Sequence, residues 1–292
     1  MKQVLVTGAT GYIGSRLTHV LLEHGHHVHL LLRKDSSLAC LEGVREQLIL
    51  HSYDGSYESA AAIFQANTID TVFHLATWFN STHKPENITD IIHSNILLGT
   101  HLLEAMAQKG CRRFINTGTY WQHNQAGEYS PNSLYAASKQ AFSDIVDYYV
   151  HHVSAITIKL FDVYGKGDTR GKIFNMLDDA SKNNKRLDMT AGEQQLRLTH
   201  VDDAVAAFLL AEALLGTPEH QKKHTLYFAG ANPVALKEVV KTYMAVTGKK
   251  VDITWGALPY RQGQIMKPYT GIKLPGWSAQ TSLEEGIRKS FI

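Results

Sequence analysis

The chain has 292 residues, 44% of them hydrophobic and 19% charged, and a formal net charge of +2. Such a length buries a sizeable core without cross-links, and so small a charge argues against a surface dedicated to nucleic acid. No apolar run reaches the roughly 18 residues of a membrane span, the start MKQVLVTGAT lacks a signal-peptide pattern, and two cysteines, Cys40 and Cys111, suit a reducing compartment. We therefore expect a cytoplasmic protein with no membrane or nucleic-acid partner.

Short apolar runs alternate with amphipathic segments over the first 160 residues. The runs predict buried strands at residues 2–8, 27–33, 70–76, 112–118 and 155–161, and the segments predict helices at 12–25, 57–67, 86–109 and 130–149. Val, Ile and Leu occupy both faces of these strands, which predicts a parallel sheet covered on both sides. The expected class is a doubly wound α/β (Rossmann) fold.

Beyond Tyr164 the alternation loosens. Residues 164–171 predict a loop, 201–215 a helix, 224–230 a strand able to rejoin the sheet, and 255–277 mostly loop. We expect a Rossmann domain of residues 1–165 plus about 196–230. A small C-terminal lobe, of about 166–195 and 231–292, is expected over the carboxyl ends of the strands, where ligands of such sheets bind.

A glycine-rich turn joins the first predicted strand to the first predicted helix. Gly8, Gly11 and Gly14 are spaced three and three, whereas the common dinucleotide fingerprint has two and three. Glycines allow a tight turn and close backbone approach, and the helix N-terminus offers N–H groups to a pyrophosphate. The context predicts a dinucleotide site, with a purely structural turn as the alternative.

The end of the second predicted strand bears on the choice of cofactor. An acid there binds the ribose of NAD, whereas an arginine suits the 2′-phosphate of NADP. Here Arg33 and Lys34 come first and Asp35 follows. A guanidinium can bind a phosphate with two hydrogen bonds, so NADP(H) is favoured over NAD(H); a solvated charge pair is the alternative.

Histidine is abundant, with 16 residues, and the run HGHHVH occupies residues 24–29. No cysteine or carboxylate joins this run at metal-ligand spacing. We interpret it as a turn and strand, and no metal site is expected.

Eight segments, in order along nearly the whole chain, resemble motifs of one family. They are TGATGYIG, YDGS, FHLAT, NILLGTHLLEA, YAASK, LFDVYGKGD, RLTHVDDAVAA and LPGWSAQTSLEEGI. Together they resemble the extended short-chain dehydrogenase/reductases, or NAD-dependent epimerase/dehydratase family, and are closest to its nucleotide-sugar 4-ketoreductases. The chain departs from the family pattern at Asp162, where asparagine is usual.

The resemblance implies the residues of the site. Those implied for the cofactor are Gly8, Thr10, Gly11, Tyr12, Ile13, Gly14, Arg33, Asp54, Gly55, Leu75, Ala76, Thr77, Asn95, Thr117, Tyr135, Lys139, Phe161 and Val163. Those implied for a nucleotide-sugar substrate are Trp78, Thr119, Tyr120, Asp162 and Arg197. Arg197 matches the arginine that typically meets the substrate's diphosphate. A homodimer built from the 86–109 and Tyr135 helices is also implied.

Tyr135 and Lys139 are four residues apart near the start of a predicted helix, so they share one face. An ammonium beside a phenol stabilises the phenolate, and we expect it to lower the pKa of Tyr135. The tyrosine can then exchange a proton with a carbonyl or hydroxyl oxygen while hydride moves at a nicotinamide. The resemblance places the third catalytic residue at Thr119, where a strand ends.

Other polar residues receive structural interpretations. Asp202 and Asp203 fit a capped helix start better than a pair of catalytic carboxylates. His200 is expected to be structural, and Cys111, just before a strand, to be inert.

Residues that the chain lacks narrow the choice among the reactions of the family. The family's sugar dehydratases carry Asp-Glu after the catalytic threonine, whereas Tyr120 and Trp121 follow Thr119 here. Reductases that also epimerise carbon use a cysteine and a histidine, and no cysteine follows Thr119 to act with His123. We expect NADPH-dependent reduction of the 4-keto group of a dTDP- or CDP-linked 4-keto-6-deoxy sugar, for surface-polysaccharide synthesis. The alternatives are an NAD-dependent nucleotide-sugar 4-epimerase and, less favoured, a non-catalytic NADP-sensing module.

Overall fold

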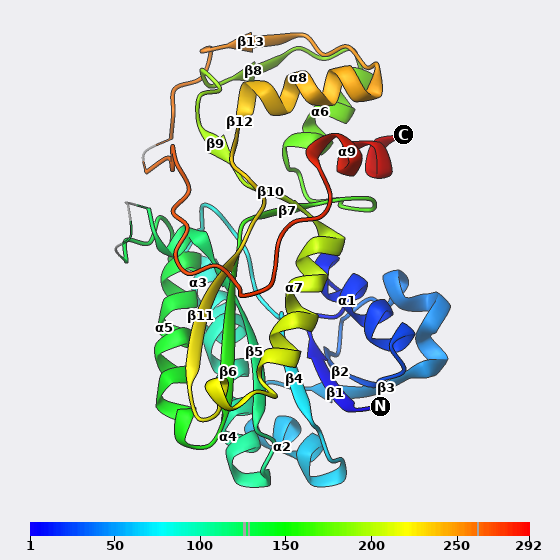
Figure 1. Cartoon of the computed structure of the whole chain (residues 1–292), viewed down its shortest axis with the longest axis vertical. Helices are drawn as coiled ribbons and strands as arrows, with labels where there is room; N and C mark the ends of the chain where they lie inside the picture. Colours follow the sequence, from blue (N-terminus) through cyan, green and yellow to red (C-terminus); the bar gives the residue numbers. More distant parts are fainter. Residues whose placement is uncertain (125–126, 128, 262) are drawn as a thin grey trace.

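The computed structural model describes residues 1–124, 127, 129–261 and 263–292. Within them, a seven-stranded sheet has the order β11-β6-β5-β4-β1-β2-β3. Its strands are β1 (Gln3–Thr7), β2 (His27–Arg33), β3 (Leu48–Tyr53), β4 (Thr71–His74), β5 (Arg113–Thr119), β6 (Ser154–Leu160) and β11 (His224–Ala229). Every neighbouring pair is parallel, which confirms the predicted doubly wound class (Figure 1).

Helices cover both faces of this sheet (Figure 1). One face carries α1 (Tyr12–Glu23) and α7 (Val201–Leu214), and the other carries α2 (Tyr57–Ala66), α4 (Leu98–Lys109) and α5 (Leu134–Tyr148). Successive strand residues point to opposite faces, so Val4 and Val6 enter the first core and Leu5 the second. Each central strand therefore stabilises two cores at once.

The strand order reverses beside β1. The chain runs outward through β2 and β3, then returns to place β4 on the other side of β1. Ligands of open α/β sheets bind beyond the carboxyl ends of the strands at such a switch point. Thr7, His74 and Thr119 end β1, β4 and β5, so the residues that follow these strands gather at one edge of the sheet.

The predicted helices are present, with local differences. The 86–109 segment is helical but irregular, passing through η2 (Pro85–Asn87), α3 (Ile88–Ile92) and the π-helical η3 (His93–Leu97) before α4. Such π-helical turns are often found at functional sites. Helix α5 begins at Leu134, later than expected, because the Ser133 hydroxyl accepts a hydrogen bond from the Ala136 N–H and caps the helix.

Strand β3 and the preceding 3₁₀ segment η1 (Ala39–Gln47) were not predicted. Strand β3 lies at the edge of the sheet, where Ile49 and Leu50 are each 40% exposed. An edge strand with exposed apolar residues lacks the clean pattern of a buried run, which is why the sequence did not reveal it. In contrast, the 224–230 segment does rejoin the sheet, as β11 paired with β6.

A smaller part of the molecule lies above the carboxyl edge of the sheet (Figure 1). It contains α6 (Ile173–Lys182), α8 (Leu236–Thr247), α9 (Leu283–Phe291) and four short strands, β8 (Leu187–Met189), β9 (Gln195–Leu196), β12 (Val234–Ala235) and β13 (Ile253–Trp255). A separate apolar cluster around Phe174, Leu177 and Tyr243 holds it together. Two strands, β7 (Asp162–Tyr164) and β10 (Leu198–His200), pair at its base.

Helices in the described part of the chain are too short or too polar to cross a membrane. The same residues contain no group of three or more His, Cys, Asp or Glu side chains suited to a metal ion. The histidine run forms a turn and the start of β2, as interpreted from the sequence. Within it, the His29 ring lies 2.9 Å from His51 and 2.7 Å from the Gln3 amide oxygen.

Candidate active site

The glycine turn is shaped by close backbone contacts. Gly8 has φ +71°, in the left-handed region, and a Cβ there would lie 2.6 Å from the Ala76 nitrogen. A Cβ on Gly14 would lie 2.1 Å from the Gly8 carbonyl oxygen. The Gly11 N–H donates to that same oxygen at 3.0 Å. Only glycine at positions 8 and 14 permits this packing of the turn against the end of β4.

Helix α1 begins without a side-chain cap. Gly11 is its N-cap, and no acidic residue stands in its first turn. The N-terminal N–H groups and the positive end of the helix dipole are therefore available to an anion. This geometry suits the pyrophosphate of a dinucleotide, as the sequence predicted for this turn.

A buried hydrogen-bond network links the ends of three strands beside the turn. The Thr7 hydroxyl lies 2.9 Å from His74 Nδ1 and accepts from the Ala76 N–H. The Thr117 hydroxyl donates to the His74 carbonyl oxygen at 3.0 Å. Burial lowers the pKa of His74 to about 3, so this ring is neutral. Leu75 and Ala76, predicted to contact the cofactor, are thereby held at the edge of the sheet.

Asn95, in the π-helical turn, is fully buried and fully hydrogen-bonded. Its side-chain oxygen accepts from the Thr77 hydroxyl at 3.0 Å and the Trp78 N–H at 2.7 Å. Its amide group donates to the Trp78 carbonyl oxygen and the Ser138 hydroxyl. The side chain therefore holds the loop after β4 against α5. In this structure Asn95, which the sequence predicted as a cofactor residue, supports the residues around the site.

Tyr135 and Thr119 are brought together, as predicted. Tyr135 lies in the first turn of α5, Thr119 ends β5, and both are buried. The rings of Phe79 and Trp121 lie edge-on to the Tyr135 ring, with centroids 5.0 and 6.3 Å away. These rings shield the phenol from water. Phe79 was not singled out in the sequence, because it lies in an irregular loop beyond the HLAT motif.

The expected lowering of the Tyr135 pKa is wrong for this structure. Burial raises the pKa of Tyr135 to about 12, and the hydroxyls of Thr77 and Thr119 and the charge of Arg170 act in the opposite direction. Lys139 does not contribute, because burial lowers its own pKa to about 7. At neutral pH the phenol therefore carries its proton.

Lys139 lies one helical turn after Tyr135 and is only 1% exposed. Its ammonium nitrogen has no hydrogen-bond partner within the described part of the structure. A buried amine without partners is costly, so this nitrogen fits a ligand that brings hydroxyl groups. The ribose of a nicotinamide nucleotide would do so, and the residues present therefore fit the expected cofactor.

A cavity of about 380 Å³, which we call the upper cavity, lies above these residues. It is lined by residues from β7, α6, β8, β9, the start of α8 and the loop around residue 260, and its described cationic lining residues are Lys172 and Arg261. Asp162 joins it to the catalytic region: its carboxylate accepts from the Tyr120 hydroxyl at 3.1 Å and pairs with the Lys172 amine at 3.6 Å. Tyr120 follows Thr119 directly.

Arg197 lies outside the lining of this cavity. Its guanidinium donates to the Ala231 carbonyl oxygen at 2.8 Å and lies 5.5 Å from the centre of the Phe161 ring. Its buried Nε has no hydrogen-bond partner among the residues that the structure describes. Phe161 in turn stacks on the Tyr120 ring at 4.8 Å.

The residues predicted for the adenosine end of the cofactor lie at the surface. The Arg33 side chain is 69% exposed, and its Nε lies 3.8 Å from Asp35. Asp54 accepts two hydrogen bonds from Ser56, which lower its pKa to about 2. Gly55 follows with φ +99°.

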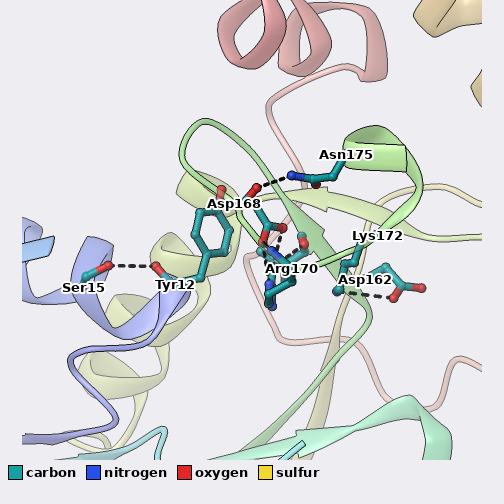
Figure 2. A network of polar contacts seen from close by, with 8 residues as sticks. Tyr12, Ser15, Asp162, Asp168, Arg170, Lys172 and Asn175 are labelled. Carbon is teal, nitrogen blue, oxygen red and sulfur yellow. Dashed lines mark hydrogen bonds and ion pairs between the residues drawn. The ribbon is translucent and has the colours of Figure 1, made fainter. Parts of the chain in front are cut away.

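A second polar network lies where the glycine turn meets the upper cavity (Figure 2). The Arg170 guanidinium stacks on the Tyr12 ring, 4.7 Å from its centre, and donates twice to the Asp168 carboxylate. It also donates to the Val163 carbonyl oxygen at 2.9 Å. The sequence predicted a loop here but singled out neither Arg170 nor Asp168. Only tertiary contact with Tyr12, more than 150 residues earlier in the sequence, reveals them.

The remaining polar candidates have structural surroundings. Asp203 accepts hydrogen bonds from the Gln280 and Thr281 N–H groups, and Asp202 pairs with Arg16. His200 caps α7 through the Asp202 N–H. Burial raises the pKa of the Cys111 thiol to about 12. These contacts agree with the structural interpretations made from the sequence.

Comparison with known proteins is consistent with this geometry. Residues 4–222 match the model of the NAD dependent epimerase/dehydratase family. The chain is 28% identical to the CDP-abequose synthase of Salmonella muenchen over 99% of this chain and 96% of that protein. It is 29% identical to the dTDP-4-dehydro-6-deoxy-D-allose reductase of Streptomyces bikiniensis, over 85% and 82%. The UDP-glucuronic acid 4-epimerase of Bacillus cereus, solved with UDP-glucuronic acid and NAD, shares the fold, with a TM-score of 0.85 at 21% identity and 99% and 97% coverage.

Proposed function

Because this chain belongs to the NAD dependent epimerase/dehydratase family, we propose that it reduces the 4-keto group of a dTDP- or CDP-linked 4-keto-6-deoxy sugar, using NADPH. The observation that carries the proposal is the buried Tyr135 phenol beside the Thr119 hydroxyl, with a buried Lys139 amine that has no hydrogen-bond partner among the described residues. The names of two relatives, a CDP-abequose synthase and a dTDP-sugar reductase, support the substrate class.

Reduction of a ketone needs a proton donor at its oxygen. The Tyr135 phenol donates that proton, and the Thr119 hydroxyl holds the same oxygen in place. When bound, the nicotinamide supplies the hydride. A tyrosine with its pKa raised to about 12 remains a donor throughout the neutral range.

The remaining predicted residues take supporting roles in this proposal. Gly8, Gly11 and Gly14 would hold the pyrophosphate with the start of α1, and Asp54 would face the adenine. Lys139 would bind the nicotinamide ribose. In the upper cavity, Lys172 and Arg261 would lie near the substrate's diphosphate. Arg197, beside Phe161 but outside the lining of this cavity, would reach the diphosphate from there.

NADPH rather than NADH is the proposed donor because Arg33 and Lys34 follow β2 directly. The exposed guanidinium has only a 3.8 Å ion pair with Asp35 to break, and exposed pairs of this kind are weak. We expect Arg33→Ala to raise KM for NADPH about tenfold and to leave KM for NADH unchanged. Arg45→Ala, which replaces an exposed arginine on η1, is the control. Equal effects on both cofactors would contradict the assignment.

The activity itself is tested with purified protein, NADPH and dTDP- or CDP-linked 4-keto-6-deoxyhexoses. Oxidation of NADPH, followed at 340 nm, and an NMR spectrum of the 4-hydroxy product are the expected results. Failure to oxidise NADPH with every such ketosugar would overturn the proposal.

Nucleotide-sugar 4-epimerisation is the alternative reaction. An epimerase would copurify with tightly bound NAD and interconvert UDP-sugars without added cofactor. A reductase is expected to need stoichiometric NADPH. A third possibility, a module that senses NADP without catalysis, would keep cofactor-dependent partner binding in Tyr135→Phe.

Assembly and domain organisation complete the proposal. Two copies are proposed to associate through the α3–α4 and α5 helices, where Ile88, Ile92 and Tyr148 are exposed; light scattering measures the mass. We propose that the dinucleotide binds to residues 1–165 with about 196–230. The substrate is proposed to bind to about 166–195 with 231–292. The thiols of Cys40 and Cys111 are free, which supports a reducing, cytoplasmic setting.

A further inference from the structure

The loop of residues 165–171 lies between the glycine turn and residues that line the upper cavity, and Figure 2 shows its polar contacts. Tyr12, the first residue of α1, belongs to the glycine turn. On the other side, Gly165 and Asp168 line the upper cavity. The loop therefore touches the expected cofactor site and the expected substrate site at once.

Contact with Tyr12 is close on two sides. The Arg170 guanidinium lies 4.7 Å from the centre of the Tyr12 ring. From another side Gly165, with φ +153°, brings its backbone so near that a Cβ would lie 2.6 Å from the Tyr12 hydroxyl oxygen. The Tyr12 side chain therefore packs against both Arg170 and the Gly165 backbone.

Arg170 is held firmly in this position. Its Nε and one terminal nitrogen donate to the two Asp168 carboxylate oxygens at 2.6 and 2.7 Å, and the same terminal nitrogen donates to Val163. The Asp168 side chain is only 3% exposed. A bidentate arginine–carboxylate pair fixes the orientation of both groups.

The network continues into the cavity wall. The Asp168 carbonyl oxygen accepts from the Asn175 side chain, and Asn175 lies in α6 and lines the cavity. From Tyr12 to Asn175 each contact is a direct stack, ion pair or hydrogen bond. Tyr12 and the cavity wall are thus joined by a short, continuous chain of contacts.

We propose that Arg170 is a positioning residue that couples cofactor binding at the glycine turn to substrate binding in the upper cavity. The coupling rests on the proposed function, because it requires a dinucleotide below the loop and a nucleotide sugar above it. A cofactor that fixes the turn, and with it Tyr12, fixes the cavity wall in the geometry that accepts the nucleotide. Arg170 does not need to touch either ligand for this role.

The test measures nucleotide affinity with and without cofactor. Calorimetric titration of CDP, dTDP and UDP into the wild-type protein is expected to show tighter binding by about fivefold or more when NADP⁺ is present, a common size for such coupling. By reciprocity, the nucleotide must tighten NADP⁺ binding by the same factor. In Arg170→Met both factors should fall to about one.

Variants of Tyr12 test the contact between its ring and the Arg170 guanidinium, and they leave the Arg170–Asp168 ion pair in place. Tyr12→Phe keeps the ring under Arg170 and should keep the coupling, because the Tyr12 hydroxyl has no hydrogen-bond partner in the described structure. Tyr12→Leu removes the ring and should abolish the coupling. Arg16→Met removes a different arginine of α1, one paired with Asp202, and should leave the factor unchanged.

The outcomes distinguish this inference from the proposed function. If the wild type binds no nucleoside diphosphate in the presence or absence of NADP⁺, the proposed function fails. If the wild type binds a nucleoside diphosphate with the same affinity in the presence and absence of NADP⁺, the coupling is refuted while the proposed function stands. Undiminished coupling in folded Arg170→Met, or in Tyr12→Leu, would also refute it.

Discussion

The Asn95 amide donates a 2.9 Å hydrogen bond to the Ser138 hydroxyl, which in turn donates to the Tyr135 carbonyl oxygen at 2.8 Å. The π-helical turn is thereby tied to the first turns of α5, where Tyr135 and Lys139 stand. The other side-chain hydrogen bonds of Asn95 hold Thr77 and Trp78. One buried amide therefore fixes two sides of the candidate active site.

Replacing Asn95 by alanine should cost about 2 kcal/mol or more of unfolding free energy, because a buried group on Ser138 and partly buried groups on Thr77 and Trp78 lose their partner. Ser138→Ala removes only one of the Asn95 hydrogen bonds and should cost less. Urea denaturation of both variants measures the difference. We also expect kcat/KM to fall further in Asn95→Ala than in Ser138→Ala. Equal stability of Asn95→Ala and wild type would show that the amide is not needed to hold the loop.

Tyr135→Phe keeps the ring packed against Phe79 and Trp121 and removes only the proposed proton donor. Loss of a positioned acid typically costs about 10²- to 10⁴-fold in rate, so kcat should fall by that range while NADPH affinity, measured by fluorescence, stays near wild type. Tyr148→Phe, an exposed tyrosine at the end of the same helix, is the matched control. Near-normal turnover in Tyr135→Phe would remove this residue from the chemistry.

Lys139 makes stability depend on pH in the absence of cofactor. Burial lowers its pKa to about 7 from the ordinary 10.5, so between these values the unfolded chain binds more protons than the folded one. Unfolding free energy must then rise with pH, by about 2 kcal/mol from pH 7 to pH 9. Lys139→Met should remove this rise. Burial lowers the pKa of Lys159 to about 8, so a smaller rise of unfolding free energy with pH remains in both the wild type and Lys139→Met. The comparison of urea curves at the two pH values therefore isolates Lys139, and identical slopes would contradict its uncharged burial.

The core of the fold could be predicted from the sequence because each central strand is a short, mostly apolar run bounded by turns. Tyr135 and Lys139 could be proposed as catalytic residues because both lie in the YAASK motif at a helix start, and Thr119 because the family resemblance placed it at a strand end. Burial is a different matter: the direction of the Tyr135 pKa was predicted wrongly, since desolvation depends on side chains such as Phe79 that irregular loops bring in. Arg170 was not predicted because its contact with Tyr12 is tertiary, and no pattern within its loop indicates it.

Gly14→Ala tests whether the glycine turn is a built phosphate site or an ordinary turn. The added methyl carbon would lie 2.1 Å from the Gly8 carbonyl oxygen, an impossible contact with rigid backbone. The turn must therefore open, which should weaken NADPH binding at least tenfold and cost about 1–3 kcal/mol of stability, as overpacked sites do. At Gly11 the same methyl would lie 3.2 Å from that oxygen, so Gly11→Ala should be milder in both respects. Fluorescence titration and urea denaturation of the two variants give the comparison. If Gly14→Ala lost stability and kept wild-type NADPH affinity, the turn would be structural, and the cofactor would have to bind elsewhere on the carboxyl edge.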